Sequence, residues 1–223
     1  MVRDEIFAGI DIGSSAVRVA VGQRLPVGDK ESVHIIGAAE VAAEGINRGL
    51  INSIDDAVSS VASCIEKVEK MTGAQVGSAW VAISGANVVS IESKGVVAVS
   101  RPDGDVREDD VERAVDAAQT VAMPVNFEIL HVIPKTFTVD GQPGIKDPVG
   151  MTGLRLEVDA QIIQGMSSHI KNLHKCVHRT GVNIENLVLG VLANAEVVTT
   201  PRQKELGVAV VNIGGATTNL VVF

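Results

Sequence analysis

The sequence has few aromatic residues and few cysteines. Its 223 residues include one tryptophan, four phenylalanines and no tyrosine, so the core must be built from Val, Ile, Leu and Ala. The two cysteines, Cys64 and Cys176, fall in separate predicted helices far apart in the chain. We expect both to be reduced, buried thiols rather than parts of a disulfide framework.

Other absences exclude classes of function. No stretch approaches the roughly 18–20 apolar residues that a membrane-spanning helix needs, so no transmembrane segment is expected. We expect no signal peptide, because Arg3, Asp4 and Glu5 lead directly into a predicted strand. There is no run of Lys or Arg, and the net charge is −8. These features argue against a nucleic-acid binder, while a 46% hydrophobic content indicates a packed core.

The clearest positive feature is a turn that occurs twice. Residues 9–15 read GIDIGSS and lead into an apolar segment, and residues 210–218 read VVNIGGATT and lead into another. Glycine tolerates positive φ and lets a ligand approach the backbone, and successive turn amides form a concavity that suits phosphate oxygens. Two such hairpins that face each other are therefore expected to clamp a polyphosphate.

The first 85 residues follow an α/β pattern. β-branched, apolar segments predict strands at about 6–11, 16–22, 33–41 and 80–84. A helix is predicted to begin after Ser53, with Asp56 completing a capping box, and to end at Thr72–Gly73. Near the end of the chain a helix is expected at 167–180, a strand at 187–191 and a short helix at 193–198, before the final hairpin.

The pattern changes after Gly85, which predicts a small inserted α+β domain. Strands are expected at 88–92 and 95–100, followed by a helix over 107–121 whose charged start should be solvated. A long strand over 128–139 contains Pro134, which indicates a bend or an edge. A Gly/Pro-rich loop over 141–153 precedes an alternating strand in which Leu154, Leu156 and Val158 should share one face.

A duplicated phosphate hairpin is typical of the actin, heat-shock-70 and sugar-kinase superfamily, which this pattern resembles. Four longer blocks carry a closer resemblance: EGINRGLI at 44–51, SRPD at 100–103, EILHVIP at 128–134 and GIKDPVGMTG at 144–153. Their order and spacing are similar, along essentially the whole chain, to those of the bacterial cell-division actin FtsA. Several of these blocks lie in the inserted domain that separates FtsA from other actins.

The resemblance implies a fold class and a domain organisation. The fold class is α/β, an actin-like (ribonuclease H-like) ATPase lobe with a small inserted α+β domain. Residues 1–85 plus 164–205 would form the first lobe, 86–163 the inserted domain, and 206–223 the opening hairpin of a truncated second lobe.

The resemblance also implies a site for ATP with Mg²⁺ between the two turns. The residues that match the phosphate loops, with Asp11 also implied at the metal, are Asp11, Gly13, Ser14, Ser15, Asn212, Gly214, Gly215, Ala216, Thr217 and Thr218.

Several positions depart from the family pattern. Asn212 and Asn219 stand where the family usually has acids, Ala216 replaces a glycine, and Ala16 stands where lysine is common. Magnesium prefers anionic oxygen ligands, and a charge-assisted hydrogen bond is roughly twice as strong as a neutral one. A positive φ would be costly at Ala216. We therefore expect ATP and Mg²⁺ binding to be weakened or lost, and we expect no enzyme activity.

Partners and place in the cell also come from the resemblance. It implies an actin-like filament component at the cytoplasmic face of the membrane at the division site, which links the FtsZ ring to the membrane. Contact with FtsZ would be made beyond Phe223, and self-association and contacts with division proteins would use the inserted domain. A nucleotide-independent protein-interaction module and a type IV pilus actin-like assembly protein remain as alternatives. A sugar kinase would need a catalytic carboxylate that is not visible.

Overall fold

The chain folds into two compact units. The computed structural model describes residues 6–27, 30–85, 87–101, 103–120 and 124–223. The first unit comprises residues 1–87 and 168–223, and the second, inserted unit comprises residues 88–167. The sequence boundaries were placed at 86 and 163, and the terminal hairpin, expected to stand apart, is grouped with the first unit.

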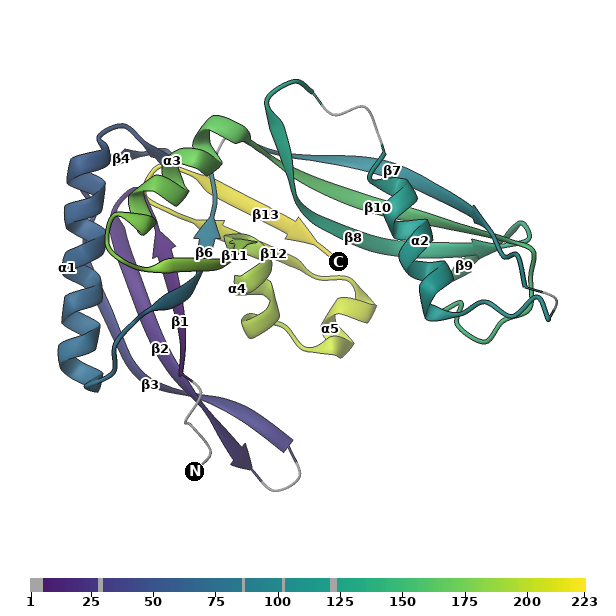
Figure 1. The fold of residues 1–223 in the computed structure, drawn as a ribbon, viewed down its shortest axis with the longest axis horizontal. Helices are drawn as coiled ribbons and strands as arrows, with labels where there is room; N and C mark the ends of the chain where they lie inside the picture. Colours follow the sequence, from purple (N-terminus) through teal and green to yellow (C-terminus); the bar gives the residue numbers. More distant parts are fainter. Residues whose placement is uncertain (1–5, 28–29, 86, 102, 121–123) are drawn as a thin grey trace. The chain divides into compact units, whose positions relative to one another are not determined.

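The first unit is built on a five-stranded mixed sheet with the order β11-β6-β1-β2-β3 (Figure 1). The strands are β1 (Ile6–Ile12), β2 (Ala16–Val27), β3 (Lys30–Ala42), β6 (Ser78–Ile83) and β11 (Asn183–Leu189). β1, β2 and β3 pair antiparallel, whereas β1, β6 and β11 run parallel to one another. The carboxyl ends of β1, β6 and β11 therefore meet at one edge of the sheet.

One face of this sheet is apolar and covered by a helix. Strand alternation places Ile10, Val17 and Val81 on it, and all three are buried. Helix α1 (Ile54–Thr72) lies on this face, where the buried Cys64 thiol is 3.4 Å from the carbonyl oxygens of both Val17 and Ala39. The other face, which carries Asp11 and Arg18 among others, is more open to solvent.

The ends of α1 agree with the sequence prediction, but the expected capping box is only half formed, because the Ser53 amide donates to the Gly45 carbonyl oxygen at 3.1 Å. The Ser53 hydroxyl accepts a hydrogen bond from the Asp56 amide at 3.5 Å, and Gly73 closes the helix at φ 70°. Helix α3 (Ser167–His178) lies near α1, since Arg179 just beyond it pairs with Asp55 at 2.7 Å.

Both cysteine thiols are buried, as expected. Burial disfavours the thiolate and raises the pKa of Cys176 to about 11.

The rest of the first unit consists of short elements. These are β4 (Ile46–Asn47), β5 (Leu50–Ile51), α4 (Gly190–Val198), α5 (Pro201–Leu206), β12 (Ala209–Ile213) and β13 (Thr218–Val222). The predicted strand 187–191 ends earlier, at Leu189, because α4 begins at Gly190. Helix α5 was not predicted, although Thr200, Pro201 and Gln203 form a capping box with proline in the first turn.

The inserted unit is a four-stranded antiparallel sheet with one helix on it (Figure 1). Its order is β7 (Val88–Ala98), β10 (Arg155–Met166), β8 (Phe127–Val139) and β9 (Gln142–Ile145). Helix α2 (Glu108–Ala118) packs on one face. The core between helix and sheet includes Ala114, Ala118, Phe137, Val139, Leu156, Val158, Ala160 and Ile162.

Three predictions for the strands and the loop of the inserted unit are wrong. The two strands at 88–92 and 95–100 are one strand, β7. Gly95 lies inside it and serves close packing, because a Cβ there would lie 1.9 Å from the Ala114 carbonyl oxygen in α2. Leu154 is 70% exposed just before β10, so it does not share the buried face of Leu156 and Val158. The loop over 141–153 contains the short strand β9, which pairs with the end of β8.

Pro134 lies inside β8 and does not end it. It pairs with Ala160 beside a register shift in β10, and β9 reaches only the later part of β8. The proline thus occupies a bulged stretch, where no ladder hydrogen bond from its nitrogen is required.

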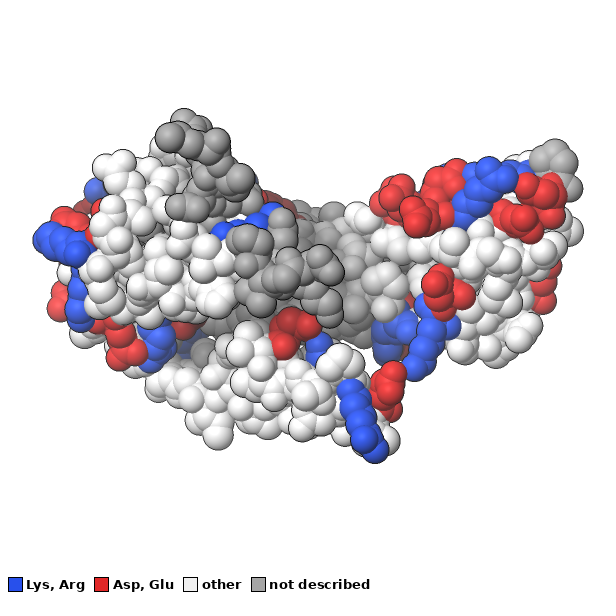
Figure 2. Space-filling model, turned by 90° about the horizontal axis from the view of Figure 1, so that it is seen from below, with Lys and Arg blue, Asp and Glu red and all other residues white. Residues whose placement is uncertain are grey.

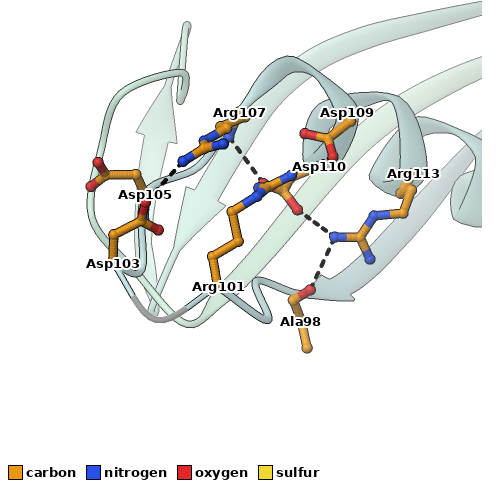
Figure 3. A network of polar contacts seen from close by, with 8 residues as sticks. All are labelled: Ala98, Arg101, Asp103, Asp105, Arg107, Asp109, Asp110 and Arg113. Atoms are coloured by element: carbon orange, nitrogen blue, oxygen red, sulfur yellow. Dashed lines mark hydrogen bonds and ion pairs between the residues drawn. The ribbon is translucent and has the colours of Figure 1, made fainter.

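The start of α2 is charged but not uniformly solvated. The Asp110 side chain is 1% exposed and forms ion pairs with Arg101 and Arg113, and it accepts a hydrogen bond from the Arg107 amide at 3.0 Å (Figure 3). The prediction of a solvated helix start is therefore wrong for this residue. Figure 2 shows cationic and acidic side chains next to one another on the inserted unit, on the right of the view.

Candidate functional site

The two glycine turns have the same local hydrogen bond. The Gly13 amide donates to the Ala16 carbonyl oxygen at 3.0 Å, and the Gly214 amide donates to the Thr217 carbonyl oxygen at 2.8 Å. The repeat seen in the sequence is thus a repeat in backbone geometry. It also means that these two amides are used within the turns.

Positive φ is not what these turns require. Gly13, Gly214, Gly215 and Ala216 all lie outside the left-handed region, so the strain expected at Ala216 is absent. Close approach explains the first glycine instead, because a Cβ at Gly13 would lie 2.9 Å from the Ala16 carbonyl oxygen.

The two turns lie against each other within the first unit. A Cβ added to Gly215 would be 2.9 Å from the Ser15 Cβ and 3.1 Å from its hydroxyl oxygen. Residues 200 positions apart in the sequence therefore approach as closely as glycine allows. The structure brings together Ser15 of the first predicted loop and Gly215 of the second.

Next to the turns is a cleft of about 750 Å³ on the open face of the sheet. Asp11 from β1 and Asn212 from β12 both line it, and Asn194 from α4 lies there as well. So does Gly190, the first residue of α4. The amino end of a helix carries a partial positive charge that favours anions. The cleft thus lies near the carboxyl ends of the parallel strands β1, β6 and β11, which is where open α/β sheets bind ligands.

An acidic–basic triad crosses the floor of the cleft. Arg18 in β2 lies between Asp11, at 3.5 Å, and Glu40 of β3, at 2.7 Å. All three side chains are about half exposed or more. Our sequence interpretation did not single out Arg18 or Glu40. The signal was available, because strand pairing across the Gly13 turn sets Arg18 opposite Asp11.

The remaining predicted residues have mixed roles. The Ser14 hydroxyl accepts a hydrogen bond from the Gly49 amide at 2.9 Å and so holds the 45–51 segment beside the first turn. Gly49 in turn packs closely on the end of β6, since a Cβ there would lie 2.7 Å from the Ser84 carbonyl oxygen. Thr217 closes the second turn through its carbonyl oxygen, and Thr218 is exposed at the start of β13.

The donor set fits a phosphate-bound magnesium ion better than a metal held by the protein alone. Magnesium usually keeps several waters and binds one or two carboxylates together with substrate phosphates. Asp11 supplies one carboxylate in the cleft, and Asn212 supplies a neutral amide. Among the described residues, no three His, Cys, Asp or Glu side chains are grouped to hold a metal.

Comparison with known proteins shows which proteins the chain is similar to. The family model described as the SHS2 domain inserted in FTSA matches residues 85–164, which nearly coincide with the inserted unit. The cell division protein FtsA of Bacillus subtilis is 37% identical over 223 residues, all of this chain and 50% of the relative. That of Borreliella burgdorferi is 35% identical over 218 residues, 98% of this chain and 52% of the relative.

The chain is FtsA-like. The similarity extends over its full length, and the FtsA-like chain spans about half the length of the curated relatives it matches.

Solved structures show the fold of the FtsA-like chain. The PilM-PilN type IV pilus biogenesis complex matches 97% of this chain and 57% of that chain, with a TM-score of 0.62 at 16% identity. Together with the sheet order, this likeness gives the predicted actin-like α/β fold with an inserted domain. At this identity the likeness concerns the fold alone, so FtsA is a better match than the type IV pilus alternative. Within the described ranges, no helix is both long and apolar enough to cross a membrane.

Proposed function

We propose that this chain belongs to a bacterial cell-division protein that binds ATP with Mg²⁺ between its two glycine turns. The observation that carries the proposal is the contact of the two turns, in which Gly215 lies against Ser15 beside the cleft that holds Asp11. Clamping by two backbone loops is a chemistry suited to a polyphosphate.

In this proposal each turn contributes its later amides. The backbone N–H groups near Ser15 and Gly215 would face phosphate oxygens, and the amino end of α4 would favour the negative charge. Asp11 would hold the hydrated magnesium ion through its carboxylate. Because Asn212 and Asn219 are neutral, we propose that the chain binds nucleotide without effective hydrolysis.

The cellular role follows from the relatives, which are named cell division proteins. We propose that the complete protein forms actin-like filaments at the cytoplasmic face of the membrane and links the FtsZ ring to it. Self-association and recruitment of division proteins would use the inserted unit, residues 88–167.

Calorimetric titration of the chain with ATP and Mg²⁺ tests nucleotide binding. Trp80, the single tryptophan, lines the cleft and provides a second signal through its fluorescence. Gly215→Val should separate the turns and weaken binding at least about tenfold, since overpacking costs about 1–3 kcal/mol. Gly77→Ala is the matched control, because a Cβ there meets nothing within 4 Å. No heat and no fluorescence change in the wild type would contradict the proposal.

A nucleotide-independent interaction module is the second candidate. Asn212 favours it, since the cleft has a neutral amide where a carboxylate would strengthen magnesium binding. Absence of ATP binding, together with retention of division-protein binding by the inserted unit, would support this candidate over the first.

A further inference from the structure

We propose that Arg18 binds the phosphate groups of the nucleotide and that Glu40 holds Arg18 when the cleft contains no nucleotide. The inference deepens the proposed function and rests on it. It assigns a ligand contact to a residue outside both glycine turns, and it gives Glu40 the role of a competitor for that contact.

Arg18 lies where its side chain can contact phosphate groups in the cleft. Its side chain projects from β2 onto the open face of the sheet, beside the Asp11 carboxylate at 3.5 Å. Among the described residues that line the cleft, Arg18 is the only one with a positive charge. A polyphosphate that approached Asp11 and Glu40 without that cation would meet two negative charges. Arg18 is therefore the side chain that can make the cleft acceptable to a polyanion.

The guanidinium group of Arg18 has more hydrogen-bond donors than its two acidic neighbours use. Its Nε atom donates to Glu40 at 2.7 Å, and an Nη atom lies 3.5 Å from Asp11. Arginine has five N–H donors in a planar fork that matches phosphate oxygens bidentately. Several of these donors remain for a ligand even while the contact with Glu40 persists.

Because both side chains are exposed to solvent, a phosphate group can replace Glu40 as the partner of Arg18. The Arg18 side chain is 51% exposed and that of Glu40 is 60% exposed, so their ion pair is screened by water and contributes little stability. A phosphate group carries more charge than a single carboxylate and can compete for the guanidinium group. Removal of the Glu40 charge should then release Arg18 and strengthen nucleotide binding.

The test is the affinity of the 223-residue chain for ATP with Mg²⁺, measured by calorimetry and by Trp80 fluorescence. We expect Arg18→Ala to weaken binding about tenfold and Arg18→Lys to weaken it less, because a charge-assisted contact is lost in the first and retained in part in the second. Glu40→Gln should tighten binding about threefold. The dependence of affinity on salt should also be less steep in Arg18→Ala, because one charge no longer contributes.

Arg179→Ala is the matched control. Arg179 forms a similar exposed ion pair with Asp55, at 2.7 Å, and is not among the residues that line the cleft. Circular dichroism checks that each variant is folded, and Arg18→Gln replaces Arg18→Ala if the alanine variant is not.

The two proposals fail in different ways. If the wild type binds ATP but Arg18→Ala binds equally well, or Glu40→Gln binds more weakly than the wild type, the role of Arg18 is overturned and the proposed function stands. If the wild type gives neither heat nor a fluorescence change, both are overturned.

Discussion

The molecule contains two clusters of acids and arginines that differ in burial. In the inserted unit, Asp110 is almost completely buried between Arg101 and Arg113 (Figure 3). In the first unit, Arg18 lies between Asp11 and Glu40, and water reaches all three side chains. The residue types are similar, whereas the solvent around them is not.

This difference in burial is the basis for assigning a structural role to Asp110 and for proposing a binding role for Arg18. A carboxylate that has lost its water must be fully paired, and removal of its partners leaves an uncompensated charge. Asp110 satisfies this need with two guanidinium groups and the Arg107 amide. The exposed cluster needs no such pairing, so its side chains can change partners at little cost in stability.

The largest expected effect is the loss of the buried acid. Asp110→Ala should lower the free energy of unfolding by about 3 kcal/mol, because it removes the shared acceptor of the Arg101 and Arg113 guanidinium groups and of the Arg107 amide at the start of α2. Asp109→Ala is the matched control: Asp109 also pairs with Arg101 but is 61% exposed. Chemical denaturation followed by circular dichroism measures both changes. If both variants lost the same free energy of unfolding, the burial of Asp110 would not explain its contribution to stability.

The same acid predicts a dependence of stability on pH. Burial alone would raise the pKa of Asp110, but the Arg107 amide and the Arg113 and Arg101 guanidinium groups outweigh it and lower that pKa. A carboxylate whose folded pKa lies below its unfolded value, about 3.9, contributes fully above the unfolded value. That contribution is lost as the pH falls through the folded pKa.

Denaturation midpoints measured from pH 6 down to pH 3 test this dependence. The wild type should lose stability more steeply in the acid part of the range than Asp110→Asn, which cannot titrate at this position. His131 and His169, whose pKa values are lowered by burial, are present in both proteins and cancel in the comparison. Parallel curves would contradict the assignment to Asp110.

Local signals predicted much of the fold. Ser53 and Gly73 marked the ends of α1, and the repeated turn led to two hairpins with one hydrogen-bond pattern. Contacts between distant segments were not predictable in the same way. The strand β7 was predicted as two strands, the second beginning at Gly95, and nothing in the sequence shows that α2 packs on this glycine. Asp110 looked solvated because its partner Arg101 comes from outside the helix.

The candidate site shows the same limit. Asp11 and the turn residues follow from the local pattern, but the contact between Ser15 and Gly215 depends on the packing of segments 200 residues apart. The position of Arg18 opposite Asp11 could have been predicted from strand alternation and from the register across the Gly13 turn. Its pairing with Glu40 required the third strand to be placed in register with the second.

A smaller effect is expected from a restored acid in the cleft. Asn212→Asp should tighten ATP binding about tenfold in the presence of Mg²⁺ and not in its absence, because a carboxylate attracts the metal and its water shell. Asn183→Asp is the control, since Asn183 is exposed at the start of β11 and is not among the residues that line the cleft. Calorimetry with and without Mg²⁺ measures the change. An equal gain without metal would argue against a metal-linked role for position 212.

The smallest expected effect is on the stability of the exposed cluster. Arg18→Ala should change the free energy of unfolding by less than about 1 kcal/mol, because an exposed ion pair contributes little. Denaturation of this variant beside Arg101→Ala compares the two clusters through the same change of side chain. Arg101→Ala should be clearly less stable, since it removes a partner from the buried Asp110. If Arg18→Ala were destabilised as much, Arg18 would be a structural residue like Arg101, and its exposure would no longer indicate freedom to bind a ligand.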